Sequence, residues 1–123
     1  MNILIDTHIF LWSLASPDKI EPARLNELES PINTVYVSSV TIAELMIKTS
    51  IGKLNINFNP KEMALKSGFK LLDFNADDAL LLKELPFHHK DPFDRMLISQ
   101  SISRKYTLMT NDKKIKQYSC TII

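Results

Sequence analysis

Four acidic residues could carry chemistry in this sequence: Asp6, Glu44, Asp94 and Asp112. Asp6 and Asp112 each follow a short apolar run and precede a helical pattern, and Asp94 falls in the first turn of another helical segment. Four carboxylates gathered in one pocket repel one another and raise one another's pKa, so such a cluster predicts a bound cation. Because all the ligands would be oxygen atoms, the favoured ion is Mg²⁺, with Mn²⁺ as a substitute.

Three of these acids also have an ordinary structural explanation. Asp6 and Asp112 stand where a carboxylate can cap the first backbone N–H groups of a helix. In the following segment, Asp91 fits the N-cap, Pro92 the first helical position and Asp94 the third, where a carboxylate complements the helix dipole. We therefore expect Asp91 to be a cap, with membership of the acidic site as the alternative.

Glu44 is harder to explain as a structural residue. Residues 40–47 are apolar on nearly every face of the predicted helix, so that helix is expected to be largely buried. A buried carboxylate loses on the order of several kcal/mol of hydration unless it is paired, protonated or bound to a cation. A salt bridge to Lys48, one helical turn later, is the alternative to metal binding.

Zinc is not expected at this site. His8, His88 and His89 show no spacing typical of zinc ligands, and Cys120 is the only cysteine. The lone cysteine also excludes an internal disulfide and favours a reducing, cytoplasmic setting.

The acids are placed by an alternation of short apolar runs and longer helical patterns. This order predicts an α/β fold, a three-layer α/β/α sandwich with a mainly parallel central sheet. The predicted strands are residues 2–5, 35–38, 71–74, 107–109 and 120–123. The predicted helices are residues 7–14, 18–28, 39–51, 60–69, 77–85, 91–105 and 112–118. Since ligands of parallel sheets bind beyond the carboxyl ends of the strands, the four acids can converge on one edge.

Length and composition set limits on the class of protein. The chain has 123 residues, which predicts one domain over residues 1–123. A net charge of +1 gives no global argument for nucleic-acid binding, so any such function depends on a local site. We expect no membrane span, because no uncharged apolar stretch approaches ~20 residues. We also expect no secretion, because the first residues lack the features of a leader.

Five motifs along the whole chain are similar, in order and spacing, to those of a known family. They are residues 4–8 with 11–12, residues 37–40 leading to Glu44 and Lys48, residues 52–54, residues 89–98 and residues 108–112. On these motifs the chain resembles the PIN-domain ribonucleases, most closely the VapC-type toxins of bacterial toxin–antitoxin pairs. No acid of the family pattern is missing, so nothing indicates an inactive copy.

The resemblance implies a Mg²⁺-dependent endoribonuclease that hydrolyses RNA phosphodiester bonds through a metal-activated water. The metal ligands would be Asp6, Glu44 and Asp94, with Asp112 completing the pocket directly or through water. Two further roles follow from position. Thr7 is expected to orient Asp6 or a metal-bound water, or else to cap a helix. Arg95 is expected to hold a phosphate, or else to pair with Asp91.

The resemblance also implies partners. These are an RNA substrate, a cognate antitoxin and a second copy of the chain in a homodimer. We expect the antitoxin to lay an apolar helix into a groove between the helix at residues 18–28 and the next one, at residues 39–51.

Two other functions fit the same fold. An aspartate-based phosphohydrolase usually has a second Asp two residues after the first, but this sequence has His8 at that position. A non-catalytic interaction module, in which the acids only cap helices, is the other alternative. Dependence on a metal would separate these functions.

Overall fold

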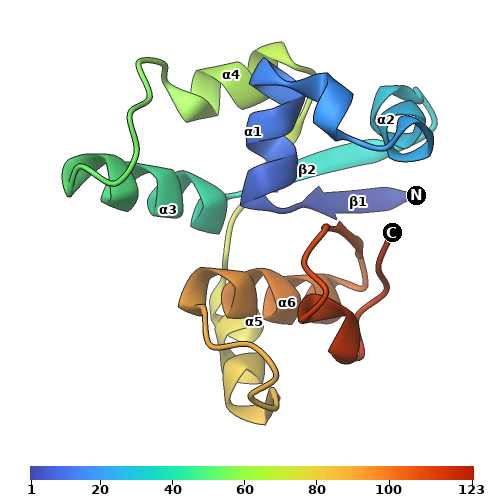
Figure 1. The fold of residues 1–123 in the computed structure, drawn as a ribbon. Coiled ribbons are helices and arrows are strands. Elements are labelled where there is room, and N and C mark those ends of the chain that lie inside the picture. The colour runs from blue at the N-terminus through green and yellow to red at the C-terminus, as the bar shows by residue number, and fades with distance from the viewer.

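The computed structural model describes residues 1–123 and is built around one four-stranded sheet (Figure 1). The strands are β1 (Asn2–Ile5), β2 (Thr34–Ser38), β3 (Lys70–Leu72) and β4 (Thr107–Met109). Their order in the sheet is β3-β2-β1-β4, and every neighbouring pair is parallel. The predicted α/β fold with a parallel central sheet is therefore confirmed.

Helices cover both faces of this sheet. The α-helices are α1 (Thr7–Ala15), α2 (Pro22–Glu29), α3 (Ser39–Ser50), α4 (Pro60–Lys66), α5 (Ala76–Leu80) and α6 (Pro92–Arg104). Short 3₁₀ helices occupy η1 (Pro17–Lys19), η2 (Leu81–Glu84) and η3 (Ile115–Gln117). Figure 1 shows α1 and α4 on one side of the sheet and α5 and α6 on the other, with α3 leaving the carboxyl end of β2. None of these helices has the length and apolar character needed to cross a bilayer.

Side-chain alternation along the strands divides the core into two clusters. Ile3 and Ile5 point to one face, where they pack with Phe10 of α1, whereas Leu4 points to the other face and packs with Leu97 of α6. All five of these side chains are fully buried. Both faces of the sheet are therefore covered, as expected for parallel strands joined by helices.

The strand order reverses beside β1, and this reversal locates the site. The chain passes from β1 to β2 and β3 on one side and returns to place β4 on the other. The backbone N–H of Asp6 donates to the carbonyl of Met109 at 3.1 Å, so the pairing of β1 with β4 continues to the end of both strands. Asp6 and the loop after β4 consequently lie together at the switch point.

Several predicted boundaries are wrong, and proline explains one of them. The helix predicted over residues 18–28 is instead the 3₁₀ helix η1 followed by α2, which begins at Pro22. Proline disfavours the helical conformation of the residue before it, and Glu21 is accordingly extended, with φ −53° and ψ 136°. Pro22 itself takes the first helical position.

Other errors fall at the ends of elements. The helix predicted over residues 60–69 ends at Lys66, because Gly68 adopts a φ of +82° and turns the chain into β3 (Lys70–Leu72), which replaces the strand predicted over residues 71–74. The helix predicted over residues 77–85 divides into α5 and the 3₁₀ helix η2. Of the predicted helix 112–118 only η3 forms, and the predicted strand 120–123 is reduced to a single bridge between Leu108 and Ile122.

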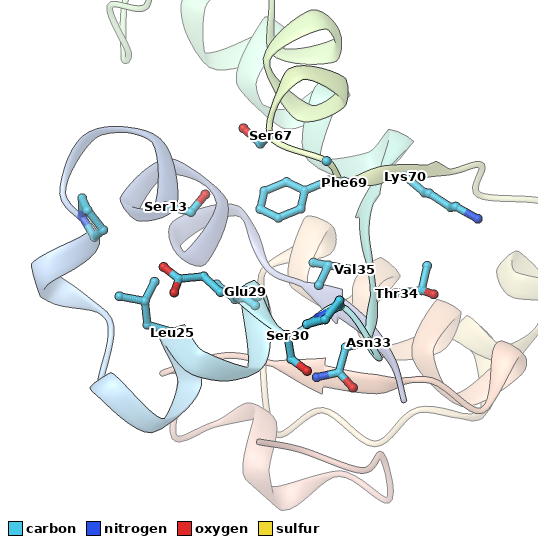
Figure 2. Close-up of a pocket in the computed structure, with 14 residues that line it drawn as sticks. Ser13, Leu25, Glu29, Ser30, Asn33, Thr34, Val35, Ser67, Phe69 and Lys70 are labelled. Atoms are coloured by element: carbon cyan, nitrogen blue, oxygen red, sulfur yellow. The ribbon is translucent and has the colours of Figure 1, made fainter.

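The predicted groove between residues 18–28 and 39–51 is also wrong. α2 lies beside the start of β2, whereas α3 leaves its end, so the two helices are at opposite ends of that strand (Figure 1). α2 borders a different cavity, of about 670 Å³, near the start of β2 and β3. Figure 2 shows Leu25 of α2 beside this cavity with Val35 and Phe69. This largest cavity is remote from the carboxyl ends of the strands.

Candidate metal centre

Asp6 joins the central strand to the first helix. It is 4% exposed, and its Oδ1 accepts a hydrogen bond from the backbone N–H of Ile9 at 2.8 Å, which makes it the N-cap of α1. The capping role expected from the sequence is therefore present. Burial raises the pKa of Asp6, and the nearby charge of Asp112 adds to the rise. A capped carboxylate still has a second oxygen atom for another partner.

Glu44 is 5% exposed and has partners on both carboxylate oxygens. Thr7 Oγ1 donates to Oε1 at 2.6 Å, and Lys48 Nζ lies 2.6 Å from Oε2. The salt bridge that was the alternative explanation for Glu44 therefore exists in the structure. Thr7 also lies 3.2 Å from the hydroxyl of Thr41, so this threonine connects the start of α1 to α3. Its contact is to Glu44 rather than to Asp6, which precedes it.

Asp94 lies in the first turn of α6, and its pKa is raised. The pKa is raised to about 6, mainly by burial and next by the charge of Asp91, with smaller contributions in the same direction from Asp6 and Glu44. Asp91 is the N-cap of α6 as expected, because its Oδ1 accepts the backbone N–H of Asp94 at 2.9 Å. Acids of two other segments, Asp6 after β1 and Glu44 in α3, thus lie close enough to affect the carboxyl group of Asp94.

Asp112 completes the cluster from the loop after β4. Its Oδ1 accepts the backbone N–H of Lys114 at 2.8 Å, and its side chain is one-third exposed. A cavity of about 280 Å³ opens beside it. The lining residues are Asp6, His8, Trp12, Asp94, Asn111 and Asp112. Three of the four predicted acids therefore border one cavity, while Glu44 does not line it and acts on Asp94 through its charge.

His89 is the site residue that sequence reasoning missed. Its Nε2 lies 2.8 Å from Asp112 Oδ2 and 2.9 Å from Asp94 Oδ2. Ligand atoms of these three residues lie within 4.8 Å of one another, close enough to surround one metal ion. The spacing of the histidines gave no indication of this, since Asp112 joins the group only through the tertiary fold. The sequence signal available was the proximity of His89 to Asp91 and Asp94.

Arg95 does not have the predicted phosphate-binding position. It is 8% exposed, and its guanidinium donates to the backbone carbonyls of Pro86 at 2.9 Å and Leu85 at 3.2 Å. It also lies 4.1 Å from the ring centre of Phe87. The structure therefore assigns Arg95 to holding the loop before α6, because its donors are used by carbonyl oxygens. It does not pair with Asp91 either.

The donors at this site fit a hard divalent cation. Asp6, Asp94 and Asp112 present carboxylate oxygen atoms to one cavity, and oxygen atoms are the preferred ligands of Mg²⁺ and Mn²⁺. Burial raises the pKa of Asp94, and the charges of Asp91, Asp6 and Glu44 add to the rise, so these acids repel one another. Binding a divalent cation would relieve that repulsion.

The comparison with protein families agrees with this geometry. A family model described as the PIN domain matches residues 3–119, and the chain belongs to the PIN domain family, a family of nucleases. The resemblance seen in the sequence is thereby confirmed. No curated protein sequence matches the chain.

Solved structures share the fold at low identity. VapBC2 from Rickettsia felis, bound to a DNA fragment from its promoter, has a TM-score of 0.76 and 22% identity, covering 100% of this chain and 98% of that one. VapBC-5 from Mycobacterium tuberculosis, a member of the VapBC family of toxin–antitoxin systems, has a TM-score of 0.59 and 18% identity over 99% and 95%. The PIN domain endonuclease Utp24 has a TM-score of 0.52 and 23% identity over 94% and 74%.

Proposed function

We propose that this chain is a Mg²⁺-dependent endoribonuclease and the toxin of a type II toxin–antitoxin pair. The observation that carries the nuclease proposal is the convergence of Asp6, Asp94 and Asp112 on one cavity at the switch point of the sheet, with Glu44 buried beside it. Carboxylates placed in this way can hold a divalent ion against a phosphate group. Membership of the PIN domain family supports the same reaction class.

In this proposal the acids of the chain hold the ion, with Mn²⁺ as a substitute for Mg²⁺. Asp6, Glu44 and Asp94 are the proposed ligands, and Asp112 completes the pocket. The bound ion supplies the acidity that makes water a nucleophile near neutral pH and the charge that offsets the phosphate oxygens. Thr7 fixes Glu44 through the hydrogen bond at 2.6 Å, so that the carboxylate is aimed before the substrate arrives.

Lys48 replaces Arg95 as the proposed phosphate contact. Its hydrogen bond to Glu44 raises the pKa of Lys48, and the charges of Asp91 and Asp94 add to the rise, so the ammonium group faces the acids. Its side chain is 39% exposed and can therefore reach a substrate. A metal ion held by Glu44 would compete with Lys48 for that carboxylate, and the Lys48 ammonium would then be available to contact a phosphate oxygen.

The proposed partners come from the structural neighbours. VapBC-5 is a member of a family of toxin–antitoxin systems, which supports an antitoxin as the partner of this chain. We also propose a homodimer and a cytoplasmic location, in keeping with a toxin that meets RNA inside the cell.

Two experiments test these proposals. Purified chain incubated with total RNA is expected to cut it in Mg²⁺ and to leave it intact in EDTA. The gene is expected to arrest growth when expressed alone and to be tolerated with its neighbouring antitoxin gene. Intact RNA in the presence of folded, metal-loaded protein would contradict the nuclease role. Normal growth with undegraded protein would contradict the toxin role.

A further inference from the structure

His89 occupies a bridging position between two acids that come from different elements. Its Nε2 is 2.9 Å from Asp94 Oδ2 on α6 and 2.8 Å from Asp112 Oδ2 in the loop after β4. The residue is 9% exposed, and its backbone N–H donates to the hydroxyl of Tyr118 at 2.9 Å. Both its backbone and its ring are therefore fixed by partners.

The partner of the other ring nitrogen decides which nitrogen carries the proton. The backbone N–H of Asp91 donates to His89 Nδ1 at 3.2 Å. A backbone N–H can only donate, so Nδ1 is the acceptor and carries no proton. These partners assign the ring proton to Nε2, which lies between the carboxylates of Asp94 and Asp112.

This arrangement is the reverse of the one found at metal-ligating histidines. A histidine that binds a metal through one nitrogen almost always donates the N–H of the other nitrogen to a carbonyl, carboxylate or water. Here Nδ1 faces a donor, the backbone N–H of Asp91. If Nε2 bound a metal, the ring proton would move to Nδ1, and two N–H groups would then face each other. The surroundings of His89 thus favour donation to the acids over ligation.

We infer that His89 is a positioning residue that clamps the carboxylates of Asp94 and Asp112 for metal binding and is not itself a ligand. The two acids repel each other and are carried by separate elements, so without a shared donor they would move apart. The Nε2–H group holds Oδ2 of each acid in place and leaves for the ion Oδ1 of Asp94 and, on Oδ1 of Asp112, the lone pair that the Lys114 N–H does not use. The inference deepens the proposed function, since it assumes that these acids bind the metal.

A pair of amide variants separates clamping from ligation. In His89→Gln the amide nitrogen can reach the place of Nε2 and donate to the acids, but the imidazole ligand is gone. In His89→Asn the shorter amide can still accept from Asp91 but cannot reach Asp94 and Asp112. Both variants are polar and of moderate size, and far-UV circular dichroism of the metal-free full chain checks that each is folded.

The measurement is calorimetric titration of each full-length protein with Mg²⁺, Mn²⁺ and Zn²⁺ in the absence of RNA. We expect His89→Asn to weaken binding by about 10 to 100-fold, the range typical of lost outer-shell support, and by similar factors for all three ions. We expect His89→Gln to stay close to the wild-type affinities. Rescue by Gln but not by Asn is a result that a merely structural role would not produce.

Three outcomes would overturn the inference. One is equal metal affinity in the wild type, His89→Gln and His89→Asn, which would show that His89 does not position the two acids. Another is a loss confined to Zn²⁺ in both variants, which makes His89 a nitrogen ligand. The third is a wild-type protein that binds no ion. The proposed nuclease role fails separately, if wild-type protein saturated with Mg²⁺ leaves RNA uncut while the titrations follow the expected pattern.

Discussion

Thr7 Oγ1 donates to Glu44 Oε1 at 2.6 Å, and this hydrogen bond joins the first residue of α1 to the middle of α3. Both side chains are buried, so the contact is shielded from competition by water. Because Thr7 follows Asp6 directly, the same bond sets the distance between two of the proposed metal ligands. Removal of this hydrogen bond should therefore lower the affinity for the metal ion.

Replacement of Thr7 by valine is predicted to weaken metal binding by about 10 to 100-fold, because Glu44 loses a donor that aims it. Valine keeps the branched shape, so the helix should still form. Thr7→Ser retains the hydroxyl and is expected to bind nearly as the wild type does. Calorimetry with Mn²⁺ measures both, and a loss in Thr7→Ser without a loss in Thr7→Val would show that the methyl group, and hence packing, is responsible.

Glu44→Gln is predicted to abolish most of the stabilisation that metal gives. A ligand that binds only the native state stabilises by about 2.7 kcal/mol at a hundredfold excess over Kd, which corresponds to a rise in melting temperature on the order of 10 °C. The metal-free variant should melt close to the wild type, because glutamine keeps the shape and the acceptor for Thr7, and the smaller cost of burying an uncharged amide offsets the lost pair with Lys48. An undiminished metal-induced rise would make Glu44 a structural residue.

Asp94→Asn is predicted to remain folded and to lose at least roughly a hundredfold in Mg²⁺-dependent RNA cleavage, because a ligand's charge is removed. Asp91→Asn should be much milder, since asparagine also serves as an N-cap. Asp18→Asn, at an exposed acid of η1 that does not line the site, is the matched control. Small and equal losses at positions 91 and 94 would assign both acids to helix capping.

The pH dependence of stability should carry the signature of Asp94. Its pKa is about 6 in the folded chain, above the ordinary value of 3.8. The favourable contribution of the protonated group is complete below the lower value and is lost as pH rises through the higher one. The melting temperature of metal-free Asp94→Asn minus that of the wild type should therefore increase between pH 4.5 and 7 and then level off. A difference independent of pH would contradict the raised pKa.

Lys48→Met is predicted to separate metal binding from cleavage. Removing the cation beside Glu44 leaves more uncompensated negative charge, so metal affinity should stay the same or rise. RNA cleavage should fall by at least roughly tenfold, as expected when a charged phosphate contact is lost. Lys53→Met, at an exposed lysine just past α3, is the control. Parallel falls in affinity and cleavage would place Lys48 in support of the metal site alone.

The sequence by itself determined the parallel α/β fold and the position of each proposed acid relative to its element. Strand alternation, Pro92 at the start of α6 and Gly52 after α3 are local signals, and local backbone preferences are sufficient to produce them. Asp6 follows β1 and Asp112 follows β4. Since parallel strands have their carboxyl ends at the same edge of the sheet, this was enough to predict that the two acids lie close together. The same local signals failed at residues 112–123, where few repeating side chains define a period.

The tertiary structure alone decided which side chains touch. Arg95 follows Asp94 directly in the chain, yet the helical turn points it into carbonyl oxygens, away from any phosphate. His89 precedes α6, and Asp112 follows β4, 23 residues later. The packing of α6 against β4 brings the two side chains together. Such contacts depend on the packing of helices against the sheet, which no local pattern encodes, and they bring Asp6, Asp94 and Asp112 to one cavity.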